Sequence, residues 1–132
     1  MSANPMQDLI IRMENYLDCW KQFNHYLGLA RFKKFTLDDE SQFMEVKSVI
    51  IQELELILAA VEGAAVRRED VHGLMTSVPS MRFLSDCNEA ALRGIENQWH
   101  ALYISWQALL GQMKARHKQT DRRGLFASLL GR

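Results

Sequence analysis

The fold is decided by residues 9–30, which read LIIRMENYLDCWKQFNHYLGLA. Apolar side chains recur along this stretch in alternating steps of four and three residues, at Leu9, Met13, Tyr16, Trp20, Phe23, Leu27 and Ala30. Because an α-helix completes a turn in about 3.6 residues, this spacing places all of them on one face. The stretch therefore predicts a helix of about 28 residues that packs against a core.

The residues that flank this stretch fit the two ends of a helix. Asn4 can act as the N-cap, Pro5 suits the first helical position, and Gln7 lies where a capping box needs it. Residues 31–34 contain three cations, which complement the negative end of the helix dipole. We therefore expect the helix to begin at Pro5 and to end near residues 31–34.

A second helix is predicted after a short turn. Thr36 can cap it, and residues 38–40 place three carboxylates in its first turn. Its apolar positions keep the helical period at Phe43, Val46, Ile50, Leu54, Ile57 and Val61. Further aliphatic residues between positions 49 and 58 widen this face, which indicates contacts with more than one neighbour. Gly63 is where we expect the helix to weaken or stop.

The last long helix has a similarly regular pattern. Its apolar positions follow helical spacing at Leu84, Cys87, Ala91, Ile95, Trp99, Leu102, Trp106, Leu109 and Met113, and Pro79 suits its opening. Between residues 66 and 78 the pattern weakens, which predicts a connection that contains a short additional helix. The predicted fold is all-α: an antiparallel bundle of three long helices that follows an up-down-up path.

Length and composition favour one bundle domain that needs no disulfide or metal cross-links. The chain has 132 residues, of which 48% are hydrophobic, and only two cysteines, too few for a disulfide framework. No basic-then-apolar export signal opens it and no apolar run approaches the roughly 20 residues of a membrane span. We therefore expect a cytoplasmic protein.

The net charge is zero but unevenly distributed. From residue 114 onward six cations face one carboxylate, a net charge of +5, which leaves −5 for residues 1–113. Such a basic end can be attracted to an anionic surface or rest on the acidic body of the same chain.

The C-terminal end carries an apolar patch that the bundle does not need. Leu125, Phe126, Leu129 and Leu130 would share one face of a helix, and Arg122 and Arg123 precede them. We divide the chain into a bundle domain, residues 1–118, and a basic linker with an apolar tail peptide, residues 119–132. The tail could pack on its own bundle, on a partner protein or on an anionic membrane surface.

Few residues suggest chemistry. Glu69 and His72 have the spacing of metal-binding bundle pairs, but the pattern occurs once, in the weakest helical stretch, which favours solvated residues. Glu96 and His100 lie four residues apart beside Trp99, which fits an exposed helix pair better than a binding site.

The aromatic residues of the last helix are expected to pack in the core. Together with Glu96 and His100, the residues Trp99, Tyr103 and Trp106 form the alternative, a groove or a homodimer surface.

The sequence predicts a non-enzymatic helical interaction or adaptor module with a C-terminal docking peptide and an unidentified protein partner. It contains no nucleophile signature, phosphate-binding loop or zinc spacing, so we expect no cofactor, no metal and no catalytic residue. Because its cations gather in one short tail, we expect no nucleic-acid partner. The alternatives are a bundle that binds a small molecule or metal near Glu96, His100 and Trp99, and a peripheral membrane protein.

Overall fold

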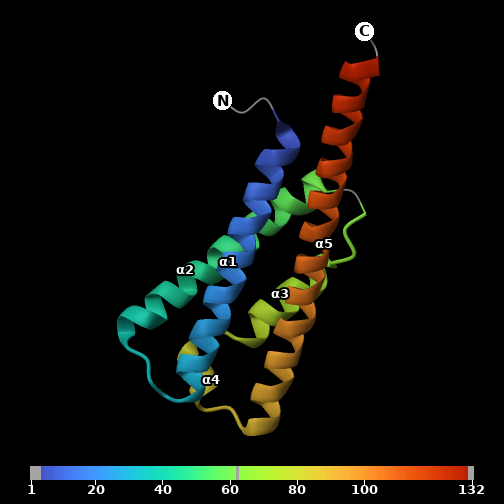
Figure 1. Cartoon of the computed structure of the whole chain (residues 1–132). Coiled ribbons are helices and arrows are strands. Elements are labelled where there is room, and N and C mark those ends of the chain that lie inside the picture. The colour runs from blue at the N-terminus through green and yellow to red at the C-terminus, as the bar shows by residue number, and fades with distance from the viewer. Residues whose placement is uncertain (1–3, 62, 131–132) are drawn as a thin grey trace.

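The computed structural model describes residues 4–61 and 63–130, and helices are the only regular secondary structure within them (Figure 1). It contains the helices α1 (Pro5–Arg31), α2 (Leu37–Ala60), α3 (Arg68–Ser77), α4 (Met81–Ser85) and α5 (Glu89–Leu130). The all-α prediction is confirmed. The three long helices and the short helix in the 66–78 connection are also present.

The ends of α1 and α2 carry the caps that the sequence indicates. The Asn4 side chain accepts a hydrogen bond from the Gln7 backbone N–H at 3.1 Å. Thr36 and Asp39 form a capping box, in which each side chain accepts from the other's backbone N–H. α2 ends at Ala60, and Gly63 follows in the left-handed region with a φ of 72°, which glycine adopts readily.

The start of the last long helix differs from the prediction. Leu84 lies in the separate helix α4, which ends at Ser85, and Cys87 lies between the two helices. Asn88 caps the start of α5, because its side chain accepts a hydrogen bond from the Ala91 backbone N–H at 2.8 Å. Turn-forming polar residues therefore interrupt an apolar pattern that reads as continuous.

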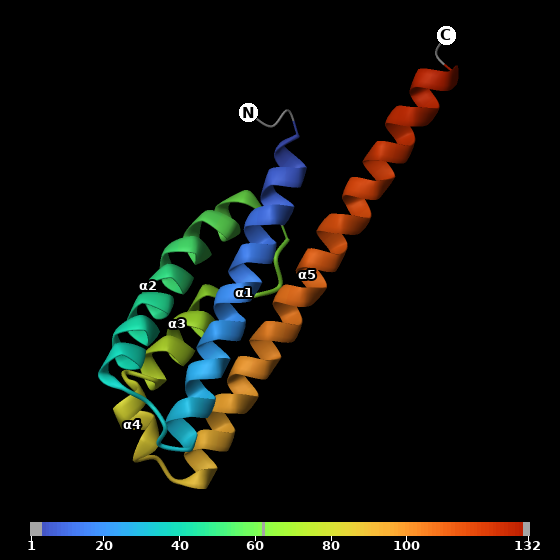
Figure 2. The ribbon, with the colours of Figure 1, turned by 60° about the vertical axis from the view of Figure 1, so that its left-hand side comes forward.

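The path of the chain also differs from up-down-up. α5 runs antiparallel to α1, since Arg31 at the end of α1 pairs with Glu89 at the start of α5, and Glu14 pairs with Lys114 at 3.1 Å (Figure 2). α2 is antiparallel to α1 as well, because Arg12 pairs with Glu53. α2 and α5 therefore run in the same direction.

The connection between them returns the chain along the whole length of α2. At its beginning Arg68 pairs with Glu55 at 2.6 Å, and at its end the Met81 backbone N–H donates to Glu40 at 2.8 Å. α3 packs on both α2 and α5, as α1 does. The third segment of the up-down-up path is thus this connection and not α5.

The core fills the space between these helices. Among the described residues no polar or charged residue is buried, and the apolar positions of the predicted stripes account for most of the core. At its centre Tyr16, Trp20 and Trp106 are at most 1% exposed. The Tyr16 hydroxyl donates to the Ile50 carbonyl of α2 at 3.0 Å, which ties α1 to α2 inside the core.

Candidate functional site

α5 is longer than the body that it packs on. Its last buried residue is Met113, Lys114 still pairs with α1, and the side chain of His117 is 20% exposed. Beyond His117 every described side chain is exposed. The helix nevertheless continues without a break to Leu130 and projects past the other helices (Figures 1 and 2). We call residues 118–130 the α5 extension.

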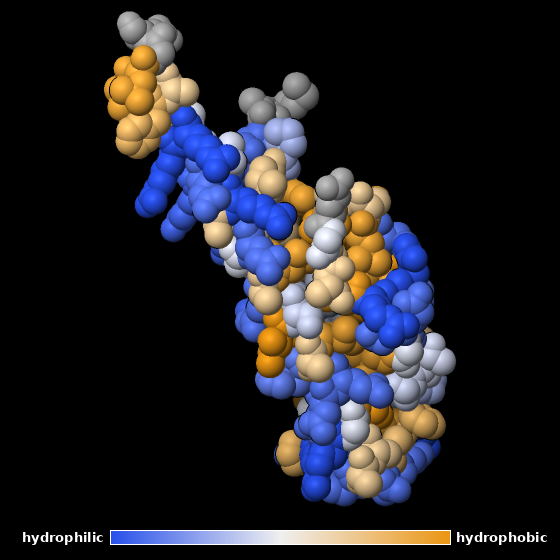
Figure 3. Space-filling model, turned by 90° about the vertical axis from the view of Figure 1, so that its right-hand side faces the viewer, coloured by the Kyte–Doolittle hydropathy of each residue, from blue (hydrophilic) through white to orange (hydrophobic). Residues whose placement is uncertain are grey.

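The predicted docking residues lie on this extension. Leu125 is 63% exposed, Phe126 64%, Leu129 70% and Leu130 77%. In the space-filling view they form an apolar tip that a hydrophilic band separates from the body (Figure 3). At about 100° of rotation per residue, all four point within about 80° of the direction opposite to Met113. The apolar face therefore looks away from the bundle.

The region expected to be a basic linker is helical. α5 runs through the predicted boundary at residues 118 and 119 as one helix of 42 residues. Residues 131 and 132 of the predicted tail lie outside the described residues. The body holds the start of α5 in place, so the extension grows from a helix that is already nucleated.

The α5 extension also carries the positive charge. Lys118, Arg122 and Arg123 are exposed, and Asp121, the one carboxylate among residues 118–130, lies 3.5 Å from the ring of His117. The cations thus form the hydrophilic band just before the apolar tip (Figure 3).

The predicted groove residues do not gather around one hollow. Trp99 and Trp106 are in the core, and the Trp99 indole donates to the Trp20 carbonyl at 2.9 Å. Tyr103 stacks on Trp99 with ring centroids 4.7 Å apart and lines a shallow groove between α1 and α5. Their burial confirms the prediction that both tryptophans pack in the core.

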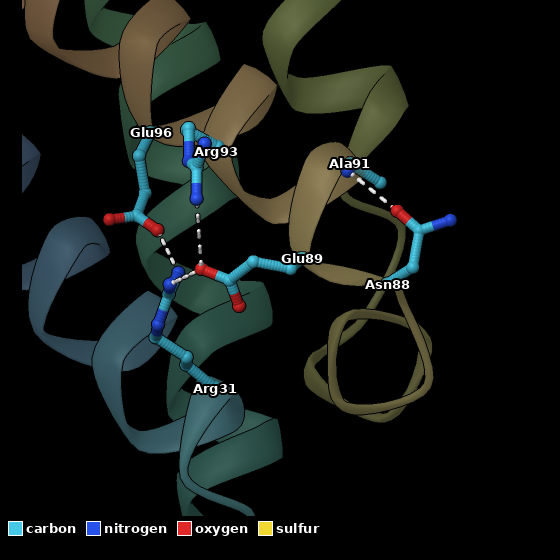
Figure 4. Close-up of polar contacts among 6 residues, drawn as sticks. All are labelled: Arg31, Asn88, Glu89, Ala91, Arg93 and Glu96. Carbon is cyan, nitrogen blue, oxygen red and sulfur yellow. Dashed lines mark hydrogen bonds and ion pairs between the residues drawn. The ribbon is translucent and has the colours of Figure 1, made fainter.

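Glu96 is part of an ionic contact instead. Arg31 binds both Glu96 and Glu89, so the end of α1 is held against the first turns of α5 (Figure 4). Arg93 approaches Glu89 at 3.9 Å, whereas His100 is exposed on the helix surface. Sequence reasoning missed Arg31 as a partner because 65 residues separate it from Glu96.

No metal site is found in the part of the chain that the structure describes. No group of three or more His, Cys, Asp or Glu side chains there could hold an ion. Glu69 lies 3.6 Å from Arg67, and the half-buried His72 lines a wide surface hollow beside Met75.

Titratable groups with shifted pKa values serve the packing of the helices. Burial lowers the pKa of Lys47, whose ammonium donates to the Val78 carbonyl after α3 at 2.6 Å. Burial raises the pKa of the half-buried Cys19 thiol, with a smaller contribution from Asp18, so this thiol is poorly suited to act as a nucleophile.

A hollow of about 390 Å³ lies between α3 and α5. Its floor is apolar, with Val66, Leu74 and Leu102, and Ala101 lies at its side. Glu69 and Asp70 supply carboxylates at the start of α3. Sequence reasoning could not find this site, because the residues come from two helices that the predicted path did not place side by side.

No family model, curated protein or solved structure matches the chain. Among the described residues, no helix combines the length and the hydrophobicity that crossing a bilayer requires.

Proposed function

We propose that this protein is a non-enzymatic helical interaction module, or adaptor, that docks onto another protein through the α5 extension. The observation that carries this proposal is the unbroken helix that leaves the body and presents four exposed apolar side chains on its outer face. An exposed apolar cluster of this kind is typical of an interaction site.

Preorganisation supports docking by this segment. Burial of Leu125, Phe126, Leu129 and Leu130 yields about 6 to 12 kcal/mol at roughly 1.5 to 3 kcal/mol each. A flexible peptide would lose about 1 to 2 kcal/mol for every residue that it orders. Because the extension is already helical, most of that cost is absent when it binds.

An anionic membrane surface is the second candidate. The cations Lys118, Arg122 and Arg123 precede the apolar tip, an order that would place positive charge near lipid headgroups. We favour a protein because the four apolar residues cover fewer than two helical turns, a short contact for an interfacial helix.

Two variants of the full chain test the proposal. The double variant Phe126→Glu/Leu129→Glu places charge on the apolar face, and the control Ala127→Glu adds a carboxylate to the same turn on another side of the helix. We expect the wild-type protein and the control to retain the same proteins in a quantitative pull-down from the native source. The double variant should lose them by at least about tenfold, because it buries two charges.

The outcomes separate the candidates. Equal retention by all three proteins would contradict docking through the extension. The membrane alternative would be supported instead by two results together. The wild type would sediment with phosphatidylserine-containing vesicles and the double variant would not, while the double variant would still retain every protein that the wild type retains.

A further inference from the structure

We infer that the surface which receives the α5 extension belongs to a second copy of this chain, with the two α5 helices packed antiparallel to each other. The pairing presupposes the docking function proposed above and names its partner.

The extension cannot reach the body of its own chain. Along a helix that rises about 1.5 Å per residue, Leu125 lies about 35 Å from Leu102 at the hollow between α3 and α5. The helix between them is unbroken, and its apolar tip faces away from the bundle. A receiving surface therefore has to come from another molecule.

α5 carries a second, outward stripe with helical spacing. Its residues are all exposed and follow steps of three and four: Ala101, Ile104, Ala108, Gly111, Ala115, Lys118, Arg122, Leu125 and Leu129. We call this stripe the outer seam. Such spacing is the pattern by which two helices pack along each other.

The two halves of the outer seam are complementary in size. The first half, from Ala101 to Ala115, is small except for Ile104, and the second half, from Lys118 to Leu129, is large. In an antiparallel pair with Ala115 at the two-fold axis, Leu129 of one copy lies over Ala101 of the other. Leu125 then lies near Ile104, which is 49% exposed in the single chain.

The two halves are compatible in charge as well. The first half of the seam has no charged residue, so Arg122 meets no like charge across the pair, and the cations Lys114 and Arg116 flank Ala115 at the axis. Arg122 lies over Ala108. Gly111 also fits this arrangement, because a side chain there would meet nothing within 4 Å in the single chain, so the monomer does not require a glycine inside this helix.

The hollow between α3 and α5 completes the receiving surface. Ala101 and Leu102 line it, so Leu129 of the second copy arrives beside its apolar floor. Glu69 and Asp70 lie within the same hollow, whose described lining contains no cation, and Glu69 also lies 3.6 Å from Arg67 outside it. The extension brings Arg122 and Arg123 toward these carboxylates, which gives the contact complementary charge.

The groove between α1 and α5 is a poorer receptor. Its lining places Lys21 and Lys114 beside Glu14 and Asp18, and Lys114 is already paired with Glu14. A basic segment would meet cations there, so charge favours the hollow on the α3 side.

The pairing is reciprocal. Each copy provides one extension and receives one, so the contact is isologous and closes as a dimer without further growth. The same seam residue on each copy, Ala115, meets itself at the axis.

Sedimentation-velocity measurements on the full chain test whether the partner is a second copy of the chain. We expect wild-type protein and Ala127→Glu to form dimers at micromolar concentration. Leu129→Glu should weaken the dimer by at least about 30-fold, because it places a carboxylate against the apolar floor of the hollow. Circular dichroism of Leu129→Glu checks that the fold is retained, since Leu129 lies outside the core.

Disulfide trapping tests the register. In a background of Cys19→Ala and Cys87→Ala, the variant Ala115→Cys should form a covalent dimer on mild oxidation, because its sulfur lies at the two-fold axis. Thr120→Cys lies on another side of the helix and should cross-link at least about tenfold more slowly.

Distinct results overturn the pairing and the docking function. A wild-type chain that stays monomeric at 100-fold higher concentration, or equal trapping of both cysteine variants, would overturn the pairing. The docking function would survive that result if Phe126→Glu/Leu129→Glu still loses its retained proteins. The docking function would be overturned as well if the double variant retains those proteins.

Discussion

Tyr16 joins three helices at the centre of the core. Its ring meets that of Trp106 edge-on with centroids 5.2 Å apart, and its hydroxyl donates to the Ile50 carbonyl. Burial raises the pKa of Tyr16 well above its ordinary value near 10, and the tyrosinate is therefore disfavoured in the folded chain.

The alkaline stability of the protein should depend on Tyr16. The raised pKa gives stability that is fully present below pH 10 and is lost as the pH rises further, by about 1.4 kcal/mol per pH unit. We expect Tyr16→Phe to lose less stability than the wild type between pH 9 and pH 11. Urea unfolding at the two pH values measures this difference, and parallel losses in both proteins would contradict it.

Arg31 should contribute more to stability than its neighbour Arg93. Arg31 is 28% exposed and binds two carboxylates of α5, whereas Arg93 is 72% exposed and approaches one. We expect Arg31→Met to lower the free energy of unfolding by about 1 kcal/mol and Arg93→Met by less than about 0.5 kcal/mol. Equal effects in thermal or urea unfolding would show that the Arg31 contacts add nothing beyond a surface pair.

At the scale of elements, the helices of the core were largely predictable. The period of residues 9–30 and the caps at Asn4 and Thr36 identify α1 and α2 because both signals are local. The break before α5 was not predictable from period alone, since Leu84 and Cys87 keep the helical spacing across it. Capping by Asn88 is the signal that could have placed it.

Two glycines should respond in opposite ways to alanine. At Gly124 a Cβ would meet nothing within 4 Å, so Gly124→Ala should stabilise the helix of the extension by about 0.5 to 1 kcal/mol. At Gly63 the positive φ is strained for alanine, so Gly63→Ala should destabilise the protein by about 1 kcal/mol. Amide exchange in the extension and urea unfolding measure the two effects, and effects of the same sign would contradict this assignment.

At the scale of the whole molecule, the sequence could not predict the path of the chain. Short helices such as α3 and α4 have weak periodicity, so residues 61–88 resemble a connection between two neighbours. The contacts of Arg68 with Glu55 and of Met81 with Glu40 hold these short helices along α2 as part of the bundle. The shared helical face of the four tip residues was predictable because their apolar pattern is local, and their docking role stays a prediction. The hollow that we assign to them depends on the path of the chain.

The dimer should weaken with salt. In the proposed dimer the cations of each extension would approach Glu69 and Asp70 of the other copy, and such exposed contacts are screened at a Debye length of about 10 Å in 0.1 M salt. We expect the dimer dissociation constant to rise several-fold between 0.05 M and 0.5 M NaCl. Glu69→Gln/Asp70→Asn should flatten this dependence, and an unchanged slope would place the cations elsewhere.

The unbroken course of α5 from the core to Leu130 gives the docking face a fixed helical phase. One residue inserted after His117 would turn that face by about 100°, whereas seven inserted residues would nearly restore its direction and move it outward by about 10 Å. The length of this helix thus sets how far the docking face lies from the body, and its pitch sets the direction in which that face points. Evolution of the contact is therefore constrained in steps of whole helical turns, and a flexible linker would carry no such constraint.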